Sequence, residues 1–163
     1  MSRLDTHIRR LLAQRACLDA LTAAISALPG PVVELGLGNG RTYDHLRERL
    51  PGREIFVFER SPDPHPACLP DPDHLILGDL EDTLPVAARR LPGKAALVHS
   101  DIGTGDAARN ARLAAWLGQA IPPIVARGGF VASDQALDHP ALRPWPLPPD
   151  VAPGRYHLYR HEP

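Results

Sequence analysis

Residues 31–42, with the sequence PVVELGLGNGRT, constrain the fold of this chain more than any other stretch. The first part, residues 32–35, is a short apolar run with β-branched side chains, which predicts a buried strand. Three glycines follow at alternate positions, and we expect Thr42 to cap the next helix, because its oxygen can accept a bond from a free backbone N–H. A strand, a glycine turn and a helix N-terminus together form a cradle for a polar ligand.

The spacing of these glycines indicates the kind of ligand. A dinucleotide site needs G-x-G-x-x-G, but Gly36, Gly38 and Gly40 form G-x-G-x-G, and Arg41 stands where the last glycine should be. This disfavours a nicotinamide-dependent oxidoreductase. With Glu34 two places before the first glycine, the pattern E-x-G-x-G-N-G resembles motif I of class I S-adenosylmethionine-dependent methyltransferases. The resemblance implies that the loop holds the methionine part of the cofactor; a plain glycine turn is the alternative.

Composition limits the class of protein. A chain of 163 residues suits one domain with one core, and 44% apolar with 23% charged residues is typical of a soluble globular protein. The net charge of −1 gives no basic field for nucleic acid. No apolar run approaches the ~18 residues of a membrane span, and the N-terminus lacks the apolar core of a signal peptide. We therefore expect neither a nucleic-acid nor a membrane partner.

The cysteines indicate the compartment. Cys17 and Cys68 have no metal-ligand spacing and form no disulfide framework. Such usage fits a reducing environment, so we expect a cytoplasmic protein.

Along the chain, predicted strands alternate with predicted helices. The strands are residues 32–35, 54–59, 74–77, 95–99, 130–133 and 154–160, and the helices are residues 3–28, 42–50, 82–91 and 106–120. The last strand is expected at an edge, antiparallel beside the fifth. This order predicts an α/β fold: a Rossmann-like, doubly wound, mostly parallel sheet with helices on both faces.

We expect a single domain over residues 1–163. It comprises an N-terminal helix (residues 1–29), a cofactor-binding core (residues 30–135), and a proline-rich loop with an edge strand (residues 136–163). The apolar stripe of the N-terminal helix covers the sheet or, because its spacing is heptad-like, forms a subunit interface. Two proline-rich stretches, 61–73 and 139–153, cannot form regular helices.

Acidic residues stand where further predicted strands end. Glu59 lies 19 positions after Gly40, near the place where a doubly wound fold binds ribose hydroxyls. The step Gly78-Asp79-Leu80 resembles the family's adenine-recognition turn. Asp101 follows the fourth strand, where the family places the transferring methyl group.

The resemblance therefore implies a set of site residues. The expected cofactor-binding residues are Glu34, Gly36, Leu37, Gly38, Asn39, Gly40, Glu59, Arg60, Gly78, Asp79, Leu80 and Asp101. Asp101 and Asp134 are the candidate catalytic bases, and His99, expected to pack on its strand, is a poorer third. Asp101 with Asp134-Gln135 also resembles the metal-ligand pattern of catechol-type O-methyltransferases, but the Gln is one methylene longer than the usual Asn, and we expect no metal.

The function implied is methyl transfer from S-adenosyl-L-methionine to a small-molecule acceptor through oxygen or nitrogen, with S-adenosyl-L-homocysteine as product. The sequence does not identify the acceptor. In a homodimer, the second subunit could supply part of the acceptor pocket. The abbreviated ending, with apparently one strand where the family has two strands and a helix, leaves open a non-catalytic cofactor-binding module.

Overall fold

The computed structural model describes residues 2–91 and 94–163. These residues form a seven-stranded sheet in the order β3-β2-β1-β4-β5-β7-β6. The strands are β1 (Val32–Leu35), β2 (Ile55–Glu59), β3 (Leu75–Leu77), β4 (Ala95–Ser100), β5 (Val125–Ser133), β6 (Leu142–Pro144) and β7 (His157–His161). β1 to β5 are mutually parallel, and β7 is antiparallel to both β5 and β6. The predicted fold class is confirmed.

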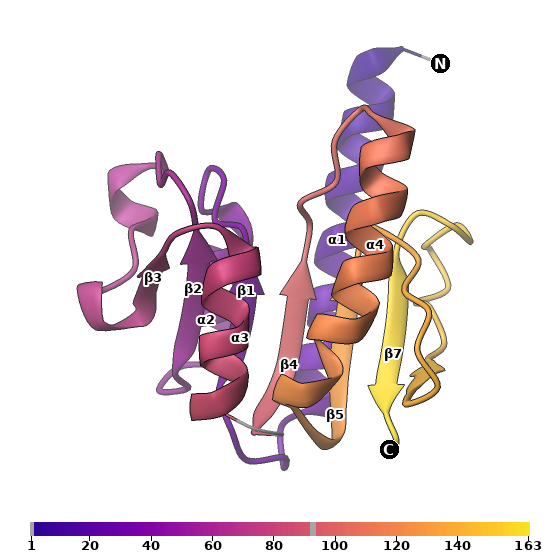
Figure 1. The fold of residues 1–163 in the computed structure, drawn as a ribbon. Coiled ribbons are helices and arrows are strands. Elements are labelled where there is room, and N and C mark those ends of the chain that lie inside the picture. The colour runs from indigo at the N-terminus through magenta and orange to yellow at the C-terminus, as the bar shows by residue number, and fades with distance from the viewer. Residues whose placement is uncertain (1, 92–93) are drawn as a thin grey trace.

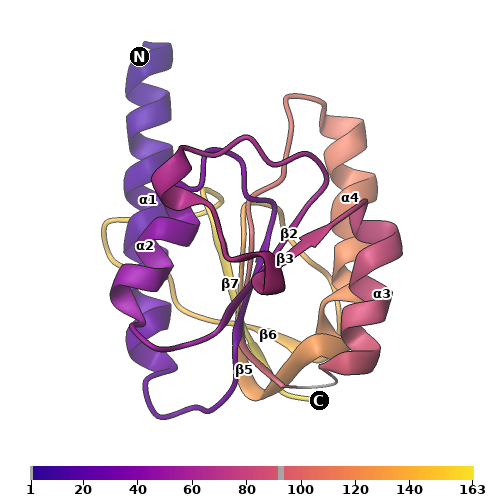
Figure 2. The same cartoon turned by 90° about the vertical axis from the view of Figure 1, so that its left-hand side faces the viewer.

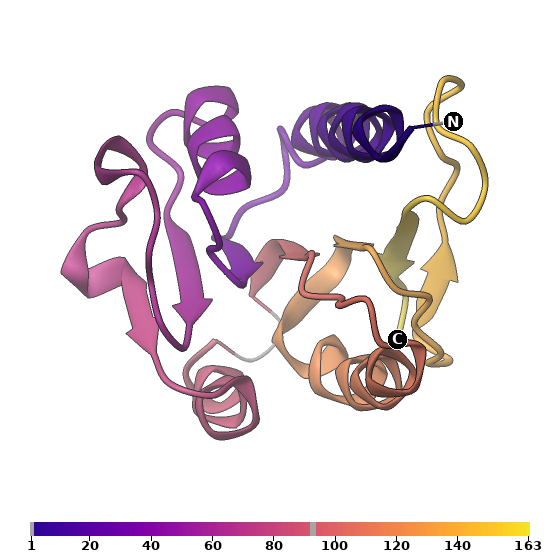
Figure 3. The same cartoon turned by 90° about the horizontal axis from the view of Figure 1, so that it is seen from above.

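Helices cover both faces of the sheet. α1 (Arg3–Ala24) and α2 (Arg41–Arg49) lie on one face, and α3 (Leu80–Arg90) and α4 (Ala107–Ala120) lie on the other (Figures 2 and 3). The chain reverses its direction of travel through the sheet between β1 and β4. In open α/β sheets, ligands bind outside the carboxyl ends of the strands at such a reversal. Both strands are buried throughout, which explains why their residues are apolar except for Glu34 in β1 and His99 and Ser100 in β4.

α1 is shorter than expected, and only its C-terminal half packs against the sheet. It ends at Ala24 rather than residue 28, and the guanidinium of Arg53 binds the carbonyl oxygens of Leu28 and Gly30 at 2.8 and 2.7 Å. Burial of α1 side chains begins only at Ala13, and the N-terminal half of the helix extends past the sheet (Figure 1). The predicted apolar stripe is therefore covered by the sheet along its second half alone.

Thr42 does not cap α2. The helix begins at Arg41 after Gly40, which adopts φ +79°, and the structure has no side-chain cap there. Thr42 already lies inside the first turn, and its hydroxyl donates to Glu34 instead. The prediction failed because the third glycine, not the threonine, occupies the turn into the helix.

Pro85 lies deeper in its helix than expected. α3 begins at Leu80, two residues before the predicted start, so the proline occupies the helix interior. Proline has no N–H to donate, and the carbonyl of Glu81 consequently lacks its helical partner. Within 61–73, regular structure is limited to two short 3₁₀ turns, Pro66–Cys68 and the start of Pro72–His74.

The C-terminal segment holds one more strand than predicted. β6 lies inside the expected loop 139–153 and forms the edge of the sheet, so β7 lies between β5 and β6 rather than at the edge. The antiparallel pairing of β7 with β5 agrees with the prediction. Trp145 packs edge-on against Phe130 at 5.1 Å between ring centroids. In the described part of the chain, no helix is both long and apolar enough to cross a membrane.

Candidate functional site

The glycine turn after β1 requires glycine for two reasons. Gly36 has φ +87°, and a Cβ there would meet Cγ2 of Ile102 at 2.3 Å. Gly40 has φ +79°, and a Cβ there would meet Cβ of Cys68 at 2.5 Å. Gly36 thus allows the loop that follows β4 to approach the turn, and Gly40 allows the proline-rich stretch 61–73 to pack against it.

The carboxylate of Glu59 faces this turn. One oxygen accepts hydrogen bonds from the N–H groups of Leu37 and Gly38 at 2.8 and 3.3 Å. The other accepts from the N–H groups of Arg60 and Ser61 at 2.8 and 3.0 Å. Partial burial opposes ionisation, but these four donors lower the pKa of Glu59 below its ordinary 4.5. The side chain is therefore a fixed anion between β2 and the glycine turn.

Two cavities meet at Gly36, Glu59 and Ile102. The first has a volume of about 660 Å³ and runs over β2 and α3 towards α4. Its lining includes the predicted residues Arg60, Gly78, Asp79 and Leu80, and also Phe58, Glu81, Asp82, Arg109, Arg112, Leu113 and Trp116. Trp116, expected in the core, is half-buried and forms part of this wall.

The second cavity, of about 360 Å³, lies between the glycine turn and α1. The turn and strand ends contribute Glu34, Gly36, Leu37, Gly38, Asn39, Arg41, Thr42, Glu59, Asp101 and Ile102, and α1 contributes His7, Arg10, Leu11 and Gln14. Every predicted cofactor residue except Gly40 therefore lines one cavity or the other. α1 thus forms one wall of the second cavity, with side chains that were not predicted as site residues.

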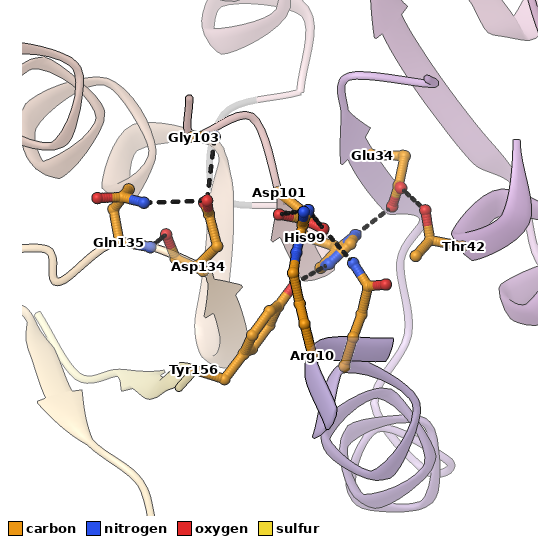
Figure 4. Close-up of polar contacts among 11 residues, drawn as sticks. Arg10, Glu34, Thr42, His99, Asp101, Gly103, Asp134, Gln135 and Tyr156 are labelled. Carbon is orange, nitrogen blue, oxygen red and sulfur yellow. Dashed lines mark hydrogen bonds and ion pairs between the residues drawn. The ribbon is translucent and has the colours of Figure 1, made fainter. Parts of the chain in front are cut away.

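A buried polar network lies behind the second cavity (Figure 4). Glu34 is 1% exposed, accepts from Thr42 and pairs with Nδ1 of His99 at 2.7 Å. Nε2 of His99 is hydrogen-bonded to the hydroxyl of Tyr156. Burial lowers the pKa of His99, but the adjacent Glu34 carboxylate more than offsets this and raises it above 6.5. Burial also raises the pKa of Tyr156 well above 10, so this phenol stays protonated.

His99 lies packed in the sheet, as expected of a strand histidine. Tyr156 was missed as a site residue. The alternation along residues 154–160 placed it on one face of a strand, but no local motif accompanies it, and its partner is 57 positions away in the chain.

Asp101 fastens α1 to the end of β4. Nη2 of Arg10 lies 2.7 and 2.6 Å from the two carboxylate oxygens, and the amide of Gln14 donates to one of them. The Asp101 side chain is 12% exposed. With three contacts from α1, this carboxylate is better placed to hold the helix than to accept a proton from a ligand.

Asp134, at the end of β5, is less fully engaged. Oδ2 accepts from the N–H of Gly103 and the amide of Gln135, each at 3.0 Å. Oδ1 is buried without a hydrogen-bond partner among the described residues. Burial and, less strongly, the charge of Asp101 raise the pKa of Asp134 above 3.8. A buried acceptor with a free oxygen and a raised pKa suits proton transfer.

Asp134 opens onto a third cavity, of about 380 Å³. The other lining residues are Arg10, Gly103, Thr104, Gly105, Gly154, Arg155 and Tyr156. Arg10 also lines the second cavity, and it forms the boundary between the two. Residues 2–91 and 94–163 contain no group of three or more His, Cys, Asp or Glu side chains that could hold a metal ion.

Comparisons with known proteins identify the relatives of this chain. Residues 1–161 match the family described as S-adenosyl-L-methionine methyltransferase. The crystal structure of an S-adenosyl-L-methionine methyl transferase from Silicibacter pomeroyi DSS-3 is 45% identical, with 99% of each chain covered and a TM-score of 0.94. No curated protein matches the sequence significantly.

More distant structures share the fold. The 1,6-didemethyltoxoflavin-N1-methyltransferase of Burkholderia thailandensis, with its substrate and S-adenosylhomocysteine bound, is 14% identical, with 93% of this chain and 79% of that chain covered and a TM-score of 0.53. Human N-acetylserotonin methyltransferase in complex with SAM is 16% identical, with 93% and 52% covered and a TM-score of 0.57. The matched family and the 45% identical structure are S-adenosyl-L-methionine methyltransferases, which argues against the nicotinamide-dependent alternative.

Proposed function

Since this chain belongs to the S-adenosyl-L-methionine methyltransferase family, we propose that it methylates a small-molecule acceptor on oxygen or nitrogen. S-adenosyl-L-methionine supplies an electrophilic methyl group on a sulfonium, and S-adenosyl-L-homocysteine is the product. The observation that carries the proposal is the Glu59 carboxylate, which faces the glycine turn where two cavities meet. That arrangement suits a ligand with a sugar at its centre and a different group on either side.

The first cavity is proposed to take the adenosine part of the cofactor. Glu59 would accept hydrogen bonds from the ribose hydroxyls in exchange for its longer backbone contacts, such as that from the N–H of Gly38 at 3.3 Å, because four N–H donors already occupy its lone-pair sites. Asp79 precedes α3 and makes no side-chain cap bond to it; its contact with Arg60 is a long, exposed ion pair of 3.4 Å. Its carboxylate is thus available to an adenine amino group, with Gly78 and Leu80 beside it.

The second cavity is proposed to take the methionine part. The N–H groups of Gly36, Leu37, Gly38 and Gly40 are already hydrogen-bonded within the fold. The turn therefore offers the N–H of Asn39, and Glu34 supplies a carboxylate. Both oxygens of Glu34 already have partners, but a carboxylate offers about four lone-pair sites. It can therefore accept one more hydrogen bond, directly or through water, from an ammonium group.

The third cavity is proposed to hold the acceptor. It adjoins the second across Arg10, so an acceptor bound there would face the methyl group, and alignment of the two reactants supplies much of the rate enhancement. Asp134 would take the proton of an acceptor that arrives protonated. Of the two candidate bases, we assign this role to Asp134 and assign Asp101 the role of holding α1 over the site.

Catalysis is favoured over the non-catalytic module. That alternative depended on a shortened C-terminal segment, but β6 and β7 complete the sheet, and Asp134 and Tyr156 on that side line the third cavity.

The test is transfer of an isotope-labelled methyl group from S-adenosyl-L-methionine to a panel of small hydroxy and amino compounds. We expect label in at least one acceptor and its loss in Asp134→Asn. Cofactor binding without transfer to any member would contradict catalysis and favour the non-catalytic module.

Two further proposals concern the protein as a whole. A cytoplasmic location is supported by two cysteines that form no disulfide.

A homodimer is supported by the exposed apolar side chains Leu4, Ile8 and Leu12, which are 66, 46 and 48% exposed on the N-terminal half of α1. Light scattering after gel filtration would find a dimer, and a strict monomer at every concentration would contradict it.

A further inference from the structure

The third cavity has an uneven distribution of charge in its wall. Two guanidinium groups line it, from Arg10 and Arg155, against one carboxylate, from Asp134. The first of the arginines is paired with Asp101. Arg155 is half-buried and makes no ion pair or side-chain hydrogen bond with any residue in the described ranges.

Asp134 lines the same cavity but does not pair with Arg155. One of its oxygens is committed to Gly103 and Gln135, and it forms no ion pair with the guanidinium. A guanidinium keeps its charge at every physiological pH. Arg155 therefore presents to the cavity a charged group that is paired with no side chain in the described ranges.

Arginine is specialised for one class of partner. Its planar fork of N–H donors matches the two oxygens of a carboxylate, and such charge-assisted pairs are about twice as strong as neutral hydrogen bonds. A partly desolvated guanidinium in a concave wall thus selects an anionic ligand over its neutral analogue. The cavity volume of about 380 Å³ suits a small molecule.

From this arrangement we infer that the methyl acceptor is a small carboxylic acid, whose carboxylate pairs with Arg155 while its hydroxyl or amino group faces Asp134. The inference rests on the proposed function and specifies its acceptor class. In this arrangement Arg155 binds the carboxylate of the acceptor, and Asp134 contacts the group that is methylated.

The test compares each acid with its own amide. The probes are 3- and 4-hydroxybenzoate and 3- and 4-aminobenzoate, each paired with the corresponding benzamide. They are titrated by calorimetry into protein saturated with S-adenosyl-L-homocysteine. We expect at least one acid to bind about tenfold or more tightly than its amide, which is the size of effect a charge-assisted hydrogen bond provides.

The variant Arg155→Gln should remove this preference. We expect it to weaken the acid about tenfold, to the level of the amide, and to leave the affinity for S-adenosyl-L-homocysteine unchanged. Arg143→Gln is the matched control, because that arginine is exposed on β6 and lines none of the three cavities. It should bind the acid as the native protein does.

Amides that bind as tightly as the acids would overturn the inference. So would an Arg155→Gln variant with unchanged acid affinity, or one that loses S-adenosyl-L-homocysteine instead, since the arginine would then serve the cofactor's own carboxylate. Failure of the native protein to bind S-adenosyl-L-homocysteine would contradict the proposed function. If the native protein binds S-adenosyl-L-homocysteine but shows no preference for acids over amides, only this inference is contradicted.

Discussion

Glu59 is the residue on which cofactor binding depends most directly. Its carboxylate is held by four backbone N–H groups at the junction of the first two cavities. It is therefore already oriented before any ligand arrives, and its lowered pKa keeps it ionised at neutral pH. Two of these donors, the N–H groups of Leu37 and Gly38, tie the end of β2 to the glycine turn.

The first prediction concerns this carboxylate. Glu59→Ala should weaken binding of S-adenosyl-L-homocysteine by about 10- to 100-fold, because the ribose would lose hydrogen bonds to a charged acceptor. Isothermal titration measures this. Glu48→Gln, on the exposed side of α2, is the control and should bind normally. An unchanged affinity in the alanine variant would remove Glu59 from the ribose site.

Asp134 allows a prediction about the reaction itself. With an acceptor from the panel, Asp134→Asn should lower kcat by about 10²- to 10⁴-fold, the range for loss of a general base, and keep its affinity for S-adenosyl-L-homocysteine. Asp138→Asn, exposed and outside all three cavities, should behave as the native enzyme.

The pH dependence follows from the same carboxyl group. A base works in its ionised form, and the pKa of Asp134 lies above 3.8. The rate should therefore rise with pH through an inflection above that value. A rate profile that is the same in the native enzyme and in Asp134→Asn would show that another group accepts the proton.

The third prediction concerns stability and His99. The pKa of His99 in the folded chain lies above its ordinary 6.5, because burial is outweighed by the Glu34 carboxylate. A raised pKa means that the folded state binds the proton more tightly than the unfolded state. The stabilisation is therefore full below pH 6.5 and is lost as the pH rises through the folded-state pKa.

We expect His99→Gln to lower the free energy of unfolding by about 3–5 kcal/mol at pH 6, since it leaves Glu34 without its buried partner. The loss should be smaller at pH 9, because a higher pH withdraws the proton from His99 and weakens the charged pair in the native protein. Urea unfolding of both proteins at the two pH values measures the difference. Equal losses at pH 6 and pH 9 would mean that the charge of His99 does not change between these pH values, and would contradict the predicted pH dependence.

At the scale of elements, α1 links the fold to the site. Side chains of the helix are buried only from Ala13 onward. Its Arg10 and Gln14 line the second cavity and bind Asp101 at the end of β4. The outer half of the helix (Figure 1) therefore depends on a small number of polar contacts for its position over the site.

Removing the outermost contact should loosen that half. We expect Arg10→Gln to speed amide hydrogen exchange about two- to fivefold in the first two turns of α1, because a partly exposed ion pair contributes up to about 1 kcal/mol. Mass spectrometry of peptides from α1 measures the change. Arg9→Gln removes an exposed arginine without an ion pair in the described structure and should have no effect. Equal exchange rates in Arg10→Gln and Arg9→Gln would contradict the proposal that Asp101 holds α1 in place.

The individual strands show how far the sequence could predict the structure. β1 and β4 were located closely because strands buried on both faces are rich in apolar residues, and only Glu34 in β1 and His99 and Ser100 in β4 are polar. β6 was missed because three residues that include Pro144 carry no periodic signal. β7 was taken for the edge strand for the same reason, since its outer neighbour was not recognised.

Site prediction divided along similar lines. Glu34 could be predicted from the resemblance of its motif to the family's, and Glu59 from its position after the glycine turn; both line the second cavity. Arg10, Tyr156 and Arg155 could not, because no local motif marks them and only the folded sheet brings them together at the third cavity. The polar residues that α1 contributes were not predicted, because amphipathic spacing predicts a buried face but not which polar side chains reach the strand ends.

At the scale of the whole molecule, one topological feature brings the three cavities to the same place. The chain reverses between β1 and β4, and the residues of the site follow the carboxyl ends of β1, β2, β4 and β5. The 45% identical structure from Silicibacter pomeroyi DSS-3 superposes over 99% of the chain, so α1 and the β6–β7 segment belong to the shared fold. The Glu59 carboxylate stands at the centre of this arrangement.

The most direct test of the cofactor site is thermal and chemical unfolding of the native protein with S-adenosyl-L-homocysteine, compared with NAD⁺ at equal concentration. A ligand that binds only the folded state stabilises it, by about 2.7 kcal/mol at 100 times its Kd. We predict a stabilisation of that order with S-adenosyl-L-homocysteine and none with NAD⁺. No shift with S-adenosyl-L-homocysteine, or an equal shift with NAD⁺, would contradict a methyl-donor site at the glycine turn and Glu59.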